Sequence, residues 1–210
     1  KALIGFAGAP FTLACYLVEG RPSRDFEQVK ILMYRDPETW HRLMAYLARV
    51  QGRYLRAQVE AGVEAVQLFD SWVGGLSPAD YREYVLPYSR QVLEALKPTG
   101  VPVIHFGTGT AGLLPLMAQA GGDVIGVDWR IDIDEAWKAV GDDKGIQGNL
   151  DPAVLLGPFS KVRERAQEIL QRVQGRWGHI FNLGHGVLPN ASLENLQRLA
   201  AWVHEASAAR

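Results

Sequence analysis

Residues 101–129 read VPVIHFGTGTAGLLPLMAQAGGDVIGVDW, and this stretch decides the class of fold. Two short apolar runs, 101–106 and 124–127, have the length of buried strands, and a helical segment separates them. Strands that are apolar along their whole length are typical of parallel sheets, because helices cover both faces. The stretch therefore predicts a strand–helix–strand unit.

The same alternation continues through the rest of the chain, which indicates an α/β fold with a parallel sheet. Because no linker, repeat or low-complexity stretch interrupts the pattern, we expect a single domain over residues 1–210. Six strands are expected, at Ala2–Ala7, Ala65–Phe69, Val101–Phe106, Val124–Val127, Lys144–Gln147 and His179–Leu183.

The helices between them carry start signals. A serine or aspartate that can cap the first turn precedes each apolar stripe, and in two cases a proline follows at the first helical position. The first helix is expected to end near Gly62 and the second at Leu96. The expected starts are Asp36–Pro37, Ser77–Pro78, Ser160 and Ser192.

Two architectures fit six such units. A (β/α)8 TIM barrel needs eight strand–helix units, so about six would lie in this span. A doubly wound open sheet needs no more strands, and Gly107–Gly112 reads G-x-G-x-x-G with Asp128 about 20 residues on, as in dinucleotide-binding proteins. A single match of this kind is weak evidence. The nucleotide-binding alternative therefore stays open at this point.

Composition limits the function classes. The 210 residues are 48% hydrophobic and carry a formal net charge of −1, which gives no overall field to attract nucleic acid or an anionic membrane. No apolar run approaches the roughly 20 residues that cross a bilayer. The single cysteine, Cys15, indicates a reducing cytoplasm. The chain starts inside a strand without a methionine, so we expect further sequence upstream.

Polar residues flanked by glycine follow most of the expected strands. In barrels these strand ends form the active-site rim, and glycine lets a ligand approach the backbone. The usual catalytic patterns are missing: Ser71 lacks the G-x-S-x-G context, no H-E-x-x-H occurs, and Cys15 has no nearby ligand partner. The residues predict a small-molecule site that holds no metal, in either an enzyme without a cofactor or a binding protein.

Five segments in order resemble the uroporphyrinogen decarboxylase family. They span nearly the whole chain, which makes the set far more specific than any one of them. They are Gly5–Leu13 with Tyr16–Gly20, Gln67–Ser71, Gly126–Trp129, Gln147–Pro152 and Asn182–Gly186.

The resemblance implies a TIM barrel that converts the four acetate side chains of uroporphyrinogen III to methyls. The product is coproporphyrinogen III, in haem and porphyrin biosynthesis, and the family needs no cofactor. Decarboxylation requires an electron sink, and a pyrrole protonated at a ring carbon provides one within the substrate itself. A homodimer is also implied.

Three polar positions match family residues. Tyr16 matches a tyrosine near a substrate acetate and is the candidate catalytic residue, although a tyrosine on a short helix is more often core. Ser71 matches a hydroxyl that contacts a substrate carboxylate, although serines after strands are more often turn residues. His185 matches a histidine at the pocket floor. Phe6 and Phe69 match cleft residues and could equally be barrel packing.

The resemblance also implies what this span lacks. The family's pyrrole-binding aspartate and its main arginines lie on preceding segments, and neither Asp70 nor Asp128 takes their place. Asp128 is expected to order its own loop, and Arg21 and Arg130 are the basic residues expected near the rim. The span alone is therefore expected to show little or no turnover. The rivals are an inactive fragment and a zinc-dependent corrinoid methyltransferase, whose His-x-Cys pair is absent from this sequence.

Overall fold

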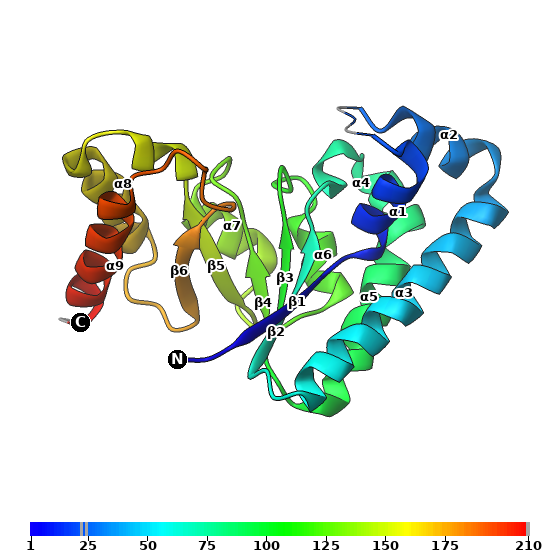
Figure 1. The fold of residues 1–210 in the computed structure, drawn as a ribbon, viewed down its shortest axis with the longest axis horizontal. Helices are drawn as coiled ribbons and strands as arrows, with labels where there is room; N and C mark the ends of the chain where they lie inside the picture. The colour runs from blue at the N-terminus through cyan, green and yellow to red at the C-terminus, as the bar shows by residue number, and fades with distance from the viewer. Residues whose placement is uncertain (22, 24, 209–210) are drawn as a thin grey trace. The chain divides into compact units, whose positions relative to one another are not determined.

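Six strands alternate with helices in the part of the chain that the structure, a computed structural model, describes: residues 1–21, 23 and 25–208 (Figure 1). This is the expected α/β pattern, and it supplies six of the eight strand–helix units of a (β/α)8 barrel, so the barrel is not closed within this span. The chain divides into two compact units, Lys1–Ile125 and Gly126–Arg210, here called unit 1 and unit 2. None of the described helices is long and apolar enough to cross a membrane.

The strands of unit 1 are hydrogen-bonded in chain order, β1-β2-β3-β4, and the β1–β2 and β2–β3 pairs are parallel. A doubly wound sheet reverses its strand order at a switch point, so the open-sheet alternative is wrong. The strands are β1 (Ile4–Gly8), β2 (Ala65–Asp70), β3 (Val103–Gly107) and β4 (Val124–Gly126), the last ending at the first residue of unit 2.

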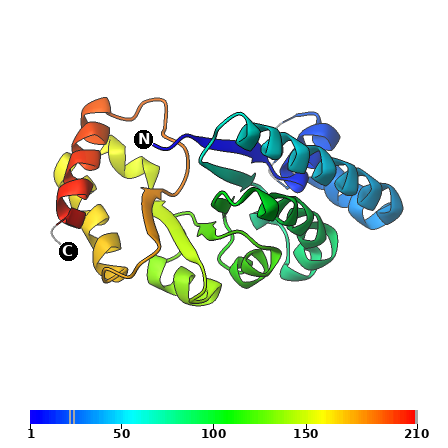
Figure 2. The same ribbon diagram turned by 90° about the horizontal axis from the view of Figure 1, so that it is seen from below.

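Helices cover one side of the strands of unit 1 (Figures 1 and 2). Helix α3 contacts both β1 and β2, and α1 contacts β2. The core between these layers contains Phe11, Trp40, Leu55 and Leu68, all completely buried. The helices are α1 (Pro10–Glu19), α2 (Glu27–Arg35), α3 (Pro37–Glu60), α4 (Pro78–Asp80), α5 (Leu86–Leu96) and α6 (Leu114–Ala120), with short 3-10 turns at Val73–Gly75 and Lys97–Thr99.

The helical stretch expected from Ser77 to Leu96 contains a π-helical turn, Tyr81–Val85, between α4 and α5. Pro87 explains the break, because proline has no backbone N–H to donate to the carbonyl four residues earlier. The turn places the side chain of Tyr81 in the core, where it is completely buried.

Strand β1 has one edge that no other described strand pairs with, and the side chain of Gln58 from α3 occupies part of it. The carboxamide oxygen of Gln58 accepts a hydrogen bond from the Phe6 backbone N–H at 2.8 Å, and its nitrogen donates to the Phe6 carbonyl at 3.0 Å. Gly5 leaves room for this contact, because a Cβ there would lie 2.5 Å from the Gln58 oxygen.

Unit 2 contains a parallel strand pair, β5 (Gly145–Leu150) and β6 (His179–Leu183). Strand β5 continues three residues beyond the predicted end at Gln147. The prediction left out polar Asn149, but its amide group donates to two backbone carbonyls and is therefore satisfied inside the fold. The helices are α7 (Ile133–Val140), α8 (Phe159–Arg172) and α9 (Leu193–Ala208), with a 3-10 turn at Pro152–Leu156.

Three of the four expected helix caps are confirmed. The side-chain oxygens of Asp36, Ser77 and Ser192 each accept a hydrogen bond from the backbone N–H three residues later. The fourth is wrong, because α8 begins at Phe159 and Ser160 lies within its first turn. Pro158, with extended backbone, occupies the capping position, two residues earlier than predicted.

Candidate active site

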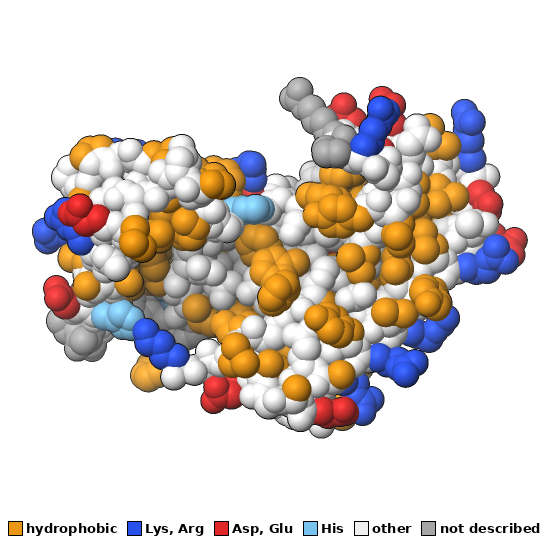
Figure 3. Space-filling model, viewed as in Figure 1, with side chains coloured by type: hydrophobic (Ala, Val, Ile, Leu, Met, Phe, Trp, Pro, Cys, Tyr) orange, Lys and Arg blue, Asp and Glu red, His pale blue; other side chains and the backbone are white. Residues whose placement is uncertain are grey.

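A row of aromatic rings crosses the strands of unit 1 on the face away from the helices. Phe69 lies beside Phe106 in the β2–β3 register, with ring centres 5.6 Å apart, and the ring of Phe6 is 5.8 Å from that of Phe69. Because side chains alternate along a strand, neighbouring residues such as Leu68 point to the helices instead. Phe6 is 63% exposed and Phe106 only 5%. The row is therefore a partly open apolar surface, and hydrophobic side chains gather on the visible face of this unit (Figure 3).

Tyr16 projects from α1 toward the segment that follows β2. Its helix buries Phe11, Ala14 and Cys15, which leaves Tyr16 on the outer face and 63% exposed. The Tyr16 ring lies 4.3 Å from the ring of Trp72, which also contacts Phe26 at 5.4 Å. Since Trp72 follows Ser71 directly, the tyrosine and serine predicted from the sequence lie on adjoining segments.

Ser71 is on a tight connection that packs against the segment after β3. The Ser71 carbonyl accepts a hydrogen bond from the Thr108 hydroxyl. A Cβ on Gly74 would lie 2.2 Å from the Thr108 carbonyl oxygen, so only glycine allows this approach. Ser71 itself is half-buried, and its hydroxyl makes no hydrogen bond with any of the described residues. The serine side chain therefore stays available to a ligand on a fixed backbone.

The close packing of the Ser71–Gly74 segment on the segment after β3 gives the glycine-rich segment Gly107–Gly112 a structural explanation. The backbone of Thr108 and Gly109 packs on Gly74. The acidic partner expected for a nucleotide, Asp128, is only 2% exposed. It accepts a hydrogen bond from the Arg130 backbone N–H at 3.2 Å and forms an ion pair with the Arg130 guanidinium. Asp128 thus orders its own loop, as predicted, and the nucleotide-binding reading has no support.

His185 belongs to unit 2 and is exposed on the connection after β6. The preceding Gly184 lies against the loop after β4, where a Cβ would be 2.8 Å from the Trp129 backbone nitrogen. The Gly184 N–H donates to the Leu150 carbonyl at 2.7 Å. Glycine is therefore required at 184, and this contact fixes the backbone that presents His185.

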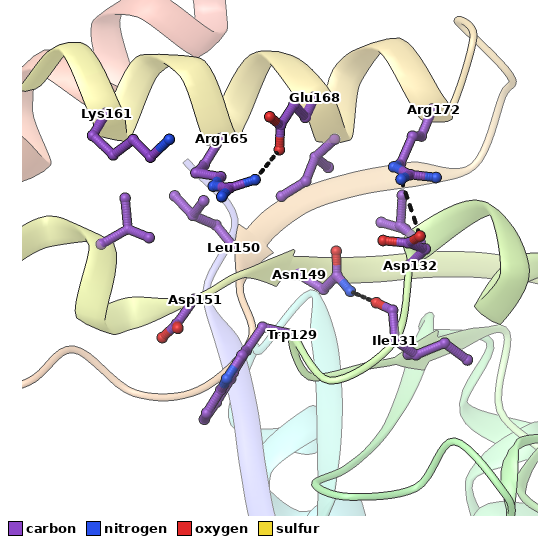
Figure 4. A pocket seen from close by; sticks show the side chains of 13 residues that line it. Trp129, Ile131, Asp132, Asn149, Leu150, Asp151, Lys161, Arg165, Glu168 and Arg172 are labelled. Carbon is purple, nitrogen blue, oxygen red and sulfur yellow. Dashed lines mark hydrogen bonds and ion pairs between the residues drawn. The ribbon is translucent and has the colours of Figure 1, made fainter.

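Unit 2 also has a pocket of about 500 Å³ beside α8, which the sequence did not indicate (Figure 4). Its cationic side chains already have partners: Arg165 pairs with Glu168 at 2.7 Å and Arg172 with Asp132 at 3.0 Å. Lys161 pairs with a neighbouring glutamate at 2.5 Å. Because each positive charge is matched, the pocket offers no net attraction to an anionic ligand.

Comparison with known proteins decides the family. The family model described as uroporphyrinogen decarboxylase (URO-D) matches residues 1–206. The chain belongs to the uroporphyrinogen decarboxylase family. It is 58% identical over 206 residues to the uroporphyrinogen decarboxylase of Streptomyces griseus, 55% identical to that of Carboxydothermus hydrogenoformans and 55% identical to that of Thermus thermophilus.

Each of these alignments covers 98% of this chain but only 56–60% of the relative. The chain therefore spans somewhat more than half the length of the decarboxylases it matches. A solved methyltransferase from Methanosarcina mazei superposes with a TM-score of 0.84 over 97% of this chain and 58% of its own. At 20% identity that similarity concerns the fold alone.

The zinc-dependent methyltransferase rival is not favoured. The sequence has one cysteine, Cys15, which is completely buried. Burial raises the pKa of the Cys15 thiol, and the charge of Asp70 raises it further, whereas a zinc ligand must be a thiolate. Among the described residues, no group of three or more His, Cys, Asp or Glu side chains could hold a metal ion.

Structure also adds residues that sequence reasoning missed. Phe106 completes the aromatic row, and Trp72 connects Tyr16 to the Ser71 segment. Phe106 could have been found, because it ends the strand that follows the one bearing Phe69. Trp72 could not, because its partners Tyr16 and Phe26 lie more than 40 residues away in the sequence.

Proposed function

We propose that the protein carrying this chain decarboxylates the four acetate side chains of uroporphyrinogen III to methyls, giving coproporphyrinogen III in haem and porphyrin biosynthesis. The observation that carries the proposal is the 55–58% identity to uroporphyrinogen decarboxylases across 98% of the chain. The partly exposed row of Phe6, Phe69 and Phe106 supports it, because a tetrapyrrole offers a large apolar surface.

The reaction needs no cofactor in this proposal. Protonation of an electron-rich pyrrole at a ring carbon makes an iminium, which accepts the electron pair released when the carboxylate leaves as CO2. The exocyclic methylene carbon then takes up a proton and becomes a methyl, and the ring carbon loses the proton it first gained, which restores the pyrrole. The protein contributes orientation and electrostatic stabilisation rather than a separate electron sink.

Each predicted site residue has a role in this scheme. Tyr16 is the candidate catalytic residue, with its hydroxyl beside a reacting acetate, and Ser71 donates to a substrate carboxylate. His185 hydrogen-bonds a propionate or the pyrrole region, and Phe6 and Phe69 shape the cleft. The exposure of Tyr16 and His185 and the unengaged hydroxyl of Ser71 are compatible with these roles.

The test is anaerobic turnover of uroporphyrinogen III by the full-length protein, with coproporphyrinogen measured by chromatography. We expect Tyr16→Phe, Ser71→Ala and His185→Gln each to lower kcat/KM by about tenfold or more. The matched controls are Tyr54→Phe, Ser160→Ala and His204→Gln, which change exposed residues outside the proposed site. These three variants should keep the kcat/KM of the wild-type protein. Absence of coproporphyrinogen with the wild-type protein would contradict the proposal.

We further propose that the protein is a homodimer that acts in the cytoplasm, without a nucleic-acid or membrane partner. The nearly balanced charge and the single, buried cysteine support this. Light scattering of the purified protein measures the dimer, and fractionation of cells followed by activity assay measures the location.

A further inference from the structure

A carboxylate lies completely buried directly beneath the segment that carries Ser71. Asp70 is the last residue of β2, and its side chain is 0% exposed. One carboxylate oxygen accepts a hydrogen bond from the Ser89 hydroxyl of α5 at 3.0 Å. The same oxygen lies 3.6 Å from Nε2 of His105 on β3. Because Ser89 and His105 are also 0% exposed, the cluster joins three elements without contact with water.

Burying these polar groups in the core is energetically unfavourable. Removing a carboxylate from water is unfavourable, and the loss is recovered only when the hydrogen-bonding capacity of the carboxylate is filled. The second oxygen of Asp70 and both ring nitrogens of His105 make no hydrogen bond with described residues. The Tyr81 hydroxyl also makes none. Apolar side chains of similar volume often replace buried charged groups without loss of stability, so stability is not a sufficient explanation for the carboxylate.

The position of Asp70 indicates what it does instead. The next residue is Ser71, whose carbonyl is bonded to Thr108, three residues after His105 along the chain. Trp72 follows, with its ring against Tyr16. Beyond the strand pairing, which extends to Asp70 and Gly107, the end of β2 is therefore connected to α5 by the Ser89 hydrogen bond and to the segment after β3 by the Thr108 hydrogen bond.

We propose that Asp70 is a positioning residue, whose carboxylate, hydrogen-bonded to Ser89 and 3.6 Å from the His105 ring, fixes the end of β2 and thereby the direction in which Ser71 and Trp72 are presented. It does not touch substrate. The functional half of this inference rests on the role proposed for Ser71, whereas the ordering of the segment does not.

The ordering is tested by hydrogen–deuterium exchange on the full-length protein. Asp70→Asn keeps the size of the side chain and removes its charge, and Ser89→Ala removes the hydrogen bond. We expect the amides of residues 71–75 to exchange about tenfold faster in both variants, with β1 and α3 unchanged. The control is Leu96→Ala, a completely buried residue of the same helix as Ser89. If the amides of residues 71–75 exchange no faster in Asp70→Asn and Ser89→Ala than in Leu96→Ala, the proposal is overturned. If Asp70→Asn does not fold, the same comparison between Ser89→Ala and Leu96→Ala decides the proposal.

The functional half is tested by a double-mutant cycle with Ser71→Ala. If Asp70 acts through Ser71, Asp70→Asn lowers kcat/KM by about tenfold to a hundredfold in the wild-type background and by less than about twofold in the Ser71→Ala background. Equal losses in both backgrounds overturn positioning through Ser71. A wild-type protein without turnover contradicts the proposed function instead, and the exchange measurement then decides the inference by itself.

Discussion

The ring of Tyr16 lies 4.3 Å from the ring of Trp72, and the two planes are inclined by 48°. This contact joins helix α1 to the segment after β2. Trp72 also contacts Phe26, with ring centres 5.4 Å apart. The exposed tyrosine is therefore held by an aromatic neighbour, which limits the directions available to its hydroxyl.

Replacing Trp72 by alanine removes both ring contacts. Aromatic pairs contribute about 0.5–1.5 kcal/mol each in addition to the burial of their surface, so we expect the free energy of unfolding to fall by at least about 1–3 kcal/mol. Trp72→Phe keeps a ring and should lose less than half of this. Urea denaturation measures the stability, and kcat/KM with uroporphyrinogen III measures the effect on the site. Equal losses of stability in Trp72→Ala and Trp72→Phe would show that the ring contacts of Trp72 do not contribute to stability.

Gly74→Ala places a Cβ 2.2 Å from a backbone oxygen that cannot move aside easily. Overpacking of this kind costs about 1–3 kcal/mol, and we expect a loss of stability in that range, measured by urea denaturation. Gly186→Ala is the matched control, because a Cβ there meets nothing within 4 Å. It should change stability by less than about 0.5 kcal/mol. A neutral Gly74→Ala would disprove the close packing of the two segments.

His179 predicts a pH dependence of stability in unit 2. Burial lowers the pKa of His179 below its ordinary value of 6.5, while the hydrogen bond of its Nε2 to the Gly148 carbonyl at 3.0 Å acts in the opposite direction. The unfolded chain therefore binds a proton at a pH where the folded chain does not. Stability is fully present above 6.5 and decreases as the pH falls below it.

The measurement is the urea midpoint at about pH 8 and about pH 5.5. We expect a smaller decrease between these two values in His179→Gln, since glutamine does not titrate and its amide can still donate to the carbonyl. His204→Gln, which changes an exposed histidine, should keep the wild-type dependence. An unchanged dependence in His179→Gln would assign it to other groups.

Cys15 should be unreactive in the folded protein. It is completely buried, and burial raises the pKa of its thiol, so little of the reactive thiolate exists near neutral pH. A thiol-specific chromogenic reagent is expected to label the chain only after urea is added. Rapid labelling of the native protein would mean that α1 opens away from the core.

The 210-residue chain alone is expected to give little or no turnover of uroporphyrinogen III. It spans 56–60% of the matching decarboxylases, and the family resemblance assigns the pyrrole-binding aspartate and the main arginines to preceding segments. Assaying the chain beside the full-length protein measures this. Substantial turnover by the chain would mean that its own residues supply those groups.

The sequence was sufficient for the order of the six strands, but α2 and α7 were not predicted. Periodicity locates strands and helices because burial on one face repeats along the chain, and His179–Leu183 is matched residue for residue. Boundaries were less accurate where a polar residue is satisfied by tertiary contacts, as at Asn149. Within the candidate site, Tyr16 and Ser71 were chosen by resemblance, but their connection through Trp72 needed coordinates, because it joins segments that are distant in sequence. The single-domain expectation and the roles of the five site residues stay predictions.

The two hydrogen bonds between the Gln58 side chain and the Phe6 backbone have a consequence for any strand that would pair with this edge of β1. An unpaired strand edge is a template on which other chains can add strands and aggregate. At Phe6 the Gln58 amide imitates one residue of a neighbouring strand and uses the groups that such an addition would need. A strand that pairs at Phe6 must first displace the Gln58 side chain, which therefore competes with strand pairing at this position without closing the edge permanently.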